Sequence, residues 1–159
     1  MQFASIDRIL KPTTIKAIKA LTEGTCELVD PDSTAAQPVA LTAPREIDAD
    51  RLARFKELLV DPQSWWFARK RCLPRPTAVV RMRGPKGNVT VSLGFSCVLW
   101  IITGRAECRS GFFDPVQHHV REILKSTFPE FASADRRSMW RFGTITHLKK
   151  QRVVTQAGK

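Results

Sequence analysis

The chain has 159 residues, of which 43% are hydrophobic and 26% are charged, and these are the proportions of an ordinary globular protein. Its formal net charge at pH 7 is +11. The longest apolar run, Val98 to Ile102, is far shorter than the roughly 20 residues of a membrane-spanning helix, and the first residues lack the pattern of an export signal. We therefore expect a cytoplasmic protein with one domain over residues 1–131 and a partly ordered basic arm over 132–159.

The N-terminal part of the chain predicts a helix followed by a strand. Apolar residues recur at helical spacing within residues 1–24, with Thr13 or Thr14 as the N-cap and Gly24 as the end of the helix. A short strand is expected over Thr25–Val29, because a cluster of turn-forming residues follows it directly.

A second helix is expected over residues 48–60. Asp48 or Asp50 can cap its N-terminus, and its apolar side chains share one face. Before this helix a short strand is predicted near 38–41, and after it a short helical turn is predicted over 64–71.

The second half of the chain predicts most of the sheet. Alternation over residues 77–83 indicates a half-buried strand with an outward basic face, and the glycines of 84–88 indicate a hairpin turn. Residues 89–101 alternate again, and we expect two strands with a bend at 94–96, because this stretch is long for one strand. An Asp-Pro pair predicts the start of a last helix over 114–128.

These elements predict an α+β fold, with an antiparallel sheet of three to five strands packed against two or three helices. In the stretch from 89 to 101, the odd-numbered positions are expected on the buried face. They include Cys97, Leu99 and Ile101.

The positive charge is concentrated in two segments. Between Asp61 and Glu107 there are eight lysines and arginines and no acidic residue, and after Asp135 there are seven and again no acidic residue. Such segregated charge favours a polyanionic partner. The candidate binding residues are Arg69, Lys70, Arg71, Arg75, Arg81, Arg83, Lys86, Arg136, Arg137, Arg141, Lys149, Lys150 and Arg152.

An aromatic cluster precedes the first of these basic residues. Trp65, Trp66 and Phe67 stand next to a basic run, a mixture that can stack on bases and contact phosphates. Aromatic side chains also close hydrophobic cores, and we expect two of the three to do so.

The sequence contains no motif of a common enzyme class. Glycine-rich phosphate loops, the serine nucleophile elbow and the zinc-protease motif are all missing from it. The cysteines, Cys26, Cys72, Cys97 and Cys108, lack the short spacing of a metal or redox site, and we expect reduced thiols, with two disulfides as the alternative. We therefore expect no enzymatic activity, no metal and no cofactor, and a thiol or zinc site is the least favoured interpretation.

Five short motifs follow one another in a fixed order between residues 52 and 131. They are Leu58-Leu59-Val60-Asp61-Pro62-Gln63-Ser64-Trp65, Lys70-Arg71-Cys72-Leu73-Pro74, Gly94-Phe95-Ser96-Cys97, Phe113-Asp114-Pro115 and Thr127-Phe128-Pro129. This series resembles a family of small uncharacterised bacterial proteins with the pattern Lys-x-Cys-x-Pro, Cys-Phe-x-Cys and Phe-Asp-Pro. The resemblance implies a shared fold and no particular activity. Gly94 stands where the family has a cysteine, which leaves Cys72 and Cys97 either as a disulfide pair or as two packed thiols.

The sequence thus predicts a non-enzymatic binding module whose basic face binds nucleic acid or a nucleoprotein complex. The alternative is an inhibitor or immunity-type module that uses the same face to bind an acidic protein, with charge steering the encounter. Neither interpretation involves a membrane.

Overall fold

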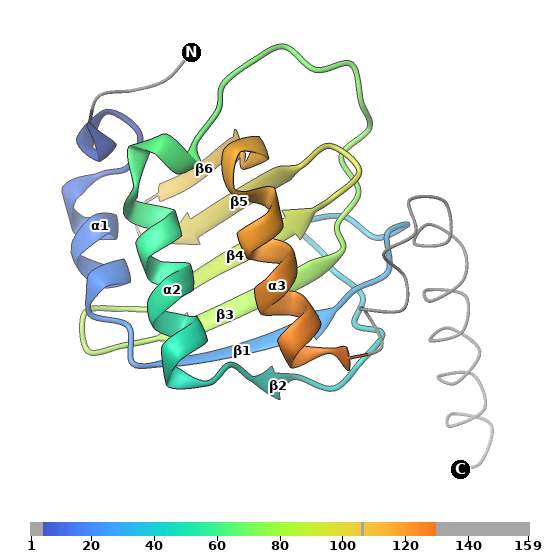
Figure 1. Ribbon diagram of the computed structural model, residues 1–159, viewed down its shortest axis with the longest axis horizontal. Helices are drawn as coiled ribbons and strands as arrows, with labels where there is room; N and C mark the ends of the chain where they lie inside the picture. Colours follow the sequence, from blue (N-terminus) through green and yellow to red (C-terminus); the bar gives the residue numbers. More distant parts are fainter. Residues whose placement is uncertain (1–4, 106, 130–159) are drawn as a thin grey trace.

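One antiparallel sheet of six strands organises the chain (Figure 1). The computed structural model describes residues 5–105 and 107–129. Neighbouring strands pair in the order β2-β1-β3-β4-β5-β6. The predicted α+β class is confirmed, and the sheet has more strands than the three to five expected. The strands are β1 (Glu23–Leu28), β2 (Arg45–Glu46), β3 (Ala78–Arg83), β4 (Val89–Gly94), β5 (Leu99–Gly104) and β6 (Glu107–Phe112).

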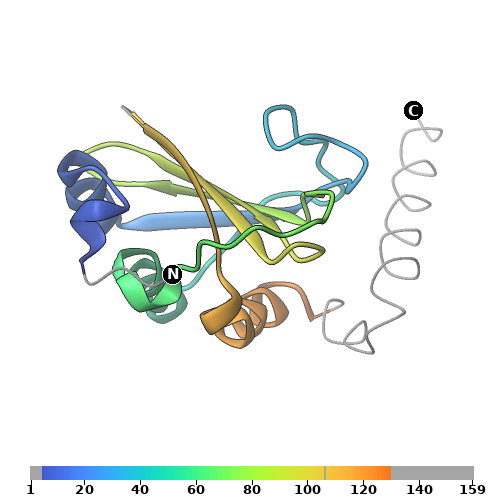
Figure 2. The same ribbon diagram turned by 90° about the horizontal axis from the view of Figure 1, so that it is seen from above.

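The helices α2 and α3 lie side by side across one face of the sheet, and α1 packs at one end of it (Figures 1 and 2). Side chains from both layers form a core that includes Phe55, Leu59, Val91, Trp100 and Leu124, each at most 1% exposed. The α-helices are α1 (Pro12–Lys19), α2 (Ala49–Val60) and α3 (Gln117–Thr127), and the short 3-10 helices are η1 (Ile6–Arg8), η2 (Pro62–Ser64) and η3 (Asp114–Val116).

Helix α2 begins and ends as the sequence predicts. The side chain of Asp48 accepts a hydrogen bond from the backbone N–H of Arg51, which is the geometry of an N-cap. The buried residues of the helix are Leu52, Phe55, Leu58 and Leu59, the set expected from its apolar spacing.

The first helix is shorter than predicted, and both of its predicted ends are wrong. Pro12 takes the first helical position, where its fixed φ angle and missing N–H are tolerated, and Lys11 precedes it with extended backbone. Thr13 and Thr14 therefore lie inside the helix. Gly24 belongs to β1, where an added side chain would come within 2.9 Å of a leucine of α2, so close packing of helix on sheet accounts for the glycine.

Residues 95–98 form the turn between β4 and β5, which confirms the two predicted strands. The turn changes which positions face the helices. Trp100 and Ile102 are fully buried in the core, whereas Leu99 and Ile101 are half-buried on the other side of the sheet. The prediction that Leu99 and Ile101 share the buried face of β4 was wrong, because alternation does not continue in phase through a turn.

Two predicted elements take a different form. Residues 38–41 contribute an isolated bridge between Ala40 and Val29. The predicted helical turn at 64–71 is replaced by extended chain, in which Trp66 exchanges both backbone hydrogen bonds with Phe112 at distances of 2.8 and 2.9 Å.

The strands β2 and β6 were missed for a physical reason. β2 has two exposed residues, and β6 has the burial pattern of an edge strand without a regular apolar alternation. β6 forms because the β5–β6 hairpin places it in register with β5, from Leu99 opposite Phe112 to Gly104 opposite Glu107.

The face of the sheet opposite the helices is covered only in part (Figure 2). Two segments lie at one end of it: the loop 30–44, and residues 66–77, which we call the arch. The arch runs past the β6 edge of the sheet, and its last residues reach this face, where Arg75 lies over Gly94 (Figure 1). The two segments are joined by an ion pair of 3.4 Å between Arg75 and Asp32, and Val79 is buried near them. The opposite end of this face carries exposed residues such as Arg81 and Thr103.

The predicted arm at 132–159 lies outside the described residues. So do six of the predicted binding residues: Arg136, Arg137, Arg141, Lys149, Lys150 and Arg152. Within residues 5–105 and 107–129, no helix has both the length and the apolar character needed to cross a bilayer.

Candidate functional site

The arch is fixed to the rest of the molecule by one covalent bond and by charge. Cys72 and Cys97 form a disulfide, so the expectation of reduced thiols was wrong for these two residues. The ammonium group of Lys70 lies 2.5 Å from a carboxylate oxygen of Asp114 and donates a hydrogen bond to the backbone carbonyl of Cys97 at 3.1 Å. Asp114 marks the start of the last helix predicted from the sequence. Its side chain makes no capping hydrogen bond and holds the arch in place instead.

Gly94 lies directly under the arch. A Cβ atom at this position would come within 2.5 Å of the backbone oxygen of Arg75. A side chain therefore fits only if the arch moves away, which accounts for glycine at a position where the resembling family has a cysteine.

A side chain at position 94 should be costly. We expect Gly94→Ala to lower the free energy of unfolding by about 1–3 kcal/mol, the usual range for overpacking. Urea denaturation followed by circular dichroism measures the effect. Gly104→Ala is the matched control, because its Cβ would meet Thr14 at an ordinary distance of 3.5 Å. An equal loss of stability in both variants would contradict the explanation.

The aromatic cluster divides between core and surface. Trp65 is fully buried, and Phe67 stacks on it with 6.0 Å between the ring centroids. The guanidinium of Arg109 lies 5.5 Å from the centre of the Phe67 ring. Trp66 is 37% exposed, so one aromatic residue of the three remains free to meet a partner.

The predicted basic residues of the described chain do not form one continuous face. Three of the seven are paired with carboxylates: Lys70 with Asp114, Arg75 with Asp32, and Arg81 with the buried Glu27. Arg69, Arg71, Arg83 and Lys86 are exposed and form no ion pair within residues 5–105 and 107–129.

These four unpaired cations lie at two opposite ends of the sheet. Arg69 and Arg71 belong to the arch, whereas Arg83 and Lys86 belong to the end of β3 and the β3–β4 turn. The six residues of β3 separate the two groups, a length of about 17–20 Å for a strand. A ligand that contacts both groups must therefore extend along the whole sheet, and a smaller ligand can contact only one of them.

The structure adds basic residues that are not among the predicted binding residues. Lys16 and Lys19 of α1, and Arg105 in the β5–β6 turn, lie at the same end of the sheet as the β3–β4 turn (Figure 1). The distribution of charge along the chain gave no signal for Lys16 and Lys19, because they lie outside the two basic segments.

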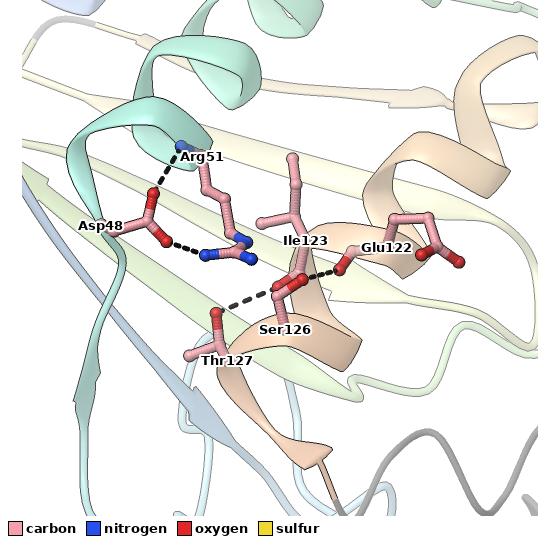
Figure 3. A network of polar contacts seen from close by, with 6 residues as sticks. All are labelled: Asp48, Arg51, Glu122, Ile123, Ser126 and Thr127. Carbon is pink, nitrogen blue, oxygen red and sulfur yellow. Dashed lines mark hydrogen bonds and ion pairs between the residues drawn. The ribbon is translucent and has the colours of Figure 1, made fainter.

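A groove with a volume of about 410 Å³ lies between α2 and α3. Figure 3 shows its polar network at the start of α2 and the end of α3. Asp48 caps α2 and pairs with the guanidinium of Arg51, and these hydrogen bonds from Arg51 lower the pKa of the Asp48 carboxyl. The residues that line the groove are Asp48, Asp50, Arg51, Arg54, His119, Glu122, Ile123 and Ser126.

The charges of this groove largely satisfy one another. Ser126 and Thr127 donate hydrogen bonds from their hydroxyl groups to backbone carbonyls one turn earlier in α3, at 2.8 and 3.0 Å. Both hydroxyl groups are thus engaged within the helix. Desolvation, followed by the neighbouring His118 and Arg54, lowers the pKa of His119, which favours its neutral form at pH 7. Acidic and basic side chains alternate along the groove, so its electrostatic potential is not of one sign and does not attract a charged ligand.

The remaining cysteines do not form a reactive site with other residues of the described chain. Burial raises the pKa of Cys26 to about 12, which keeps this thiol protonated. Cys108 is exposed on β6 next to Thr103. Within residues 5–105 and 107–129 no three histidine, cysteine or acidic side chains lie close enough together to hold a metal ion.

Comparison with known proteins bears on the fold. No family model matches the chain, and no curated protein matches it. A solved structure from Clostridium perfringens, described as a "Putative Lipoprotein", is similar with a TM-score of 0.50 and 10% sequence identity, and the match covers 80% of this chain and 98% of the other. At this identity the likeness concerns the arrangement of helices and strands and carries no function.

Proposed function

We propose that the protein is a non-enzymatic module that binds nucleic acid through exposed lysines and arginines. The observation that carries this proposal is the group of exposed cations without carboxylate partners in the described residues, in a chain with a net charge of +11. Unpaired cations on a surface attract phosphates and release the counterions condensed on them.

Salt dependence tests the proposal. A fluorescently labelled single strand of about 24 nucleotides and the corresponding duplex are titrated with the full chain at salt concentrations from about 50 to about 200 mM. If four or more cations contact phosphates, log K should fall with log salt with a slope of about −3.6 or steeper for the duplex and about −2.8 or steeper for the single strand. Fluorescence anisotropy gives the affinities. An affinity that does not change with salt concentration, or the absence of binding at low salt, would contradict the proposal.

An acidic protein partner is the second candidate, and one observation favours it. The large apolar side chains that are exposed in the described residues, Leu73, Val39 and Trp66, all belong to the arch and the loop 30–44. Exposed apolar residues beside Arg69 and Arg71 are typical of protein interfaces. Association that survives nuclease treatment would favour this candidate over nucleic acid.

The disulfide is informative about the cellular compartment in which the protein functions. Disulfides persist in oxidising compartments and are rare in the cytosol. The Cys72–Cys97 bond therefore favours an oxidising environment, and the cytoplasmic location stays a prediction. If the bond is intact in cells, the protein partner is the candidate to test first, since nucleic acid is concentrated in the reducing cytosol.

A further inference from the structure

One end of the molecule is built from three elements that meet at the turns of the sheet (Figures 1 and 2). The C-terminal end of α1 packs on the β3–β4 turn, where the backbone N–H of Thr22 donates to the carbonyl of Arg83 at 2.8 Å. The N-terminal part of α1 reaches the β5–β6 turn, because Gly104 lies against the side chain of Thr14. The helix therefore spans the ends of both hairpins.

Close packing holds this end rigid. A Cβ atom on Gly84 would come within 2.6 Å of the carbonyl oxygen of Ala20, so the turn and the end of α1 are in direct backbone contact. Gly87 has a φ of +125°, a conformation that glycine adopts without strain, and it closes the turn next to Lys86. The backbone at this end therefore has little conformational entropy to lose on binding.

Five exposed cations gather there, and we call this group the hairpin end. Its members are Lys16, Lys19, Arg83, Lys86 and Arg105. None of them forms an ion pair within residues 5–105 and 107–129. In register, Glu23 lies opposite Arg83 and reduces the local charge by one.

Glu107 also lies at this end, and its carboxylate lowers the local charge by one more. Both oxygens of Glu107 accept hydrogen bonds from the backbone N–H of Lys11, at 3.0 and 3.2 Å, at the start of α1. A carboxylate at this position offsets the positive end of the helix dipole, and neither Lys16 nor Lys19 forms an ion pair with it. The helix itself contains no acidic residue.

The chemistry of this surface fits phosphate better than a lipid bilayer. Peripheral helices that bind membranes insert apolar residues beside their basic ones. The exposed large apolar residues of the described chain are Val39, Trp66 and Leu73, and all three belong to the loop 30–44 and the arch. The hairpin end offers point charges without an apolar wedge, as non-specific binding to a phosphate backbone requires.

We infer that the hairpin end is the surface that contacts the phosphate backbone of nucleic acid, single-stranded or duplex, without reading its sequence. This inference rests on the proposed function and assigns its site. It gives α1 a role in binding, and it implies that the cations of the arch contribute less to the affinity for nucleic acid.

The test compares two triple variants that lose the same charge. Lys19→Gln/Lys86→Gln/Arg105→Gln neutralises the hairpin end, and Arg69→Gln/Arg71→Gln/Arg75→Gln neutralises the arch as the matched control. The probes are the labelled single strand and duplex of about 24 nucleotides used for the wild type. The hairpin-end variant should bind both probes at least about tenfold more weakly. Its salt slope should be shallower by about 2.7 for the duplex and about 2 for the single strand, for three lost contacts. The arch variant should keep the wild-type slope.

The outcomes separate the site from the function. Failure of the wild-type chain to bind either probe removes the proposed function and the site together. Wild-type binding with equal effects of the two triple variants, with no effect of either, or with the larger effect in the arch, overturns the hairpin end and leaves the function standing. Binding to phosphatidylserine vesicles that is as tight as binding to the oligonucleotides would also overturn the assignment to nucleic acid. Circular dichroism spectra confirm that both variants are folded.

Discussion

Replacing Trp65 with alanine should lower the free energy of unfolding by about 3–5 kcal/mol, the range for large aromatic residues in a core. Trp65 is fully buried. Its indole Nε1–H donates to the backbone carbonyl of Leu59 at 3.0 Å, and its ring packs 4.9 Å from that of Trp100. Alanine would leave a cavity between α2 and the sheet and a buried carbonyl without its partner.

The neighbouring residue supplies the control. Trp66→Ala removes an identical side chain that is 37% exposed, and the backbone hydrogen bonds of Trp66 to Phe112 do not depend on it. Its effect on unfolding should stay below about 1 kcal/mol. Urea denaturation followed by circular dichroism distinguishes the two tryptophans. Similar losses in both variants would contradict the division of this cluster into a core residue and a surface residue.

Breaking the disulfide should lower the free energy of unfolding by about 3.5 kcal/mol, from the entropy of a closed loop with a sequence separation of 25 residues. Cys72→Ser is the suitable variant, because Cys72 is exposed and a serine there remains solvated, whereas Cys97 is buried. The fold should persist, since Trp66 and Thr77 still tie the arch to the sheet through backbone hydrogen bonds.

Reducing the disulfide in the wild-type protein gives an independent measurement of the stability that this bond contributes. Wild-type protein in dithiothreitol should unfold at the same urea concentration as Cys72→Ser, and the reductant should leave the variant unchanged. Cys108→Ser is the control, since Cys108 is an exposed free cysteine. Equal stability of the oxidised and reduced wild type would show that the bond contributes nothing to the fold.

The local signals of the sequence identified the elements whose formation depends on neighbouring residues. Asp48 caps α2, and the apolar spacing of its residues gives its buried face. Alternation predicted β3, and the glycines of the following turn predicted the hairpin with β4. In these elements the residues that determine the structure lie within one helical turn or one hairpin of each other.

The candidate site was predictable only in part, because charge along the chain says nothing about pairing in space. Lys70, Arg75 and Arg81 belong to a segment without acidic residues, yet each meets a carboxylate from elsewhere in the chain. Lys16 and Lys19 come from a helix with no unusual charge, and the fold places them beside the turn that contains Lys86.

The sequence by itself determined the α+β class, the cap and buried face of α2, and the hairpin of β3 and β4, because short-range sterics and hydrogen bonds govern these features. The tertiary structure alone decided that β6 completes the sheet, that Cys72 meets Cys97, and that the basic residues separate toward two ends. Each of these outcomes depends on contacts between residues distant in the chain, whose relative positions follow from packing α1, α2 and α3 on the sheet.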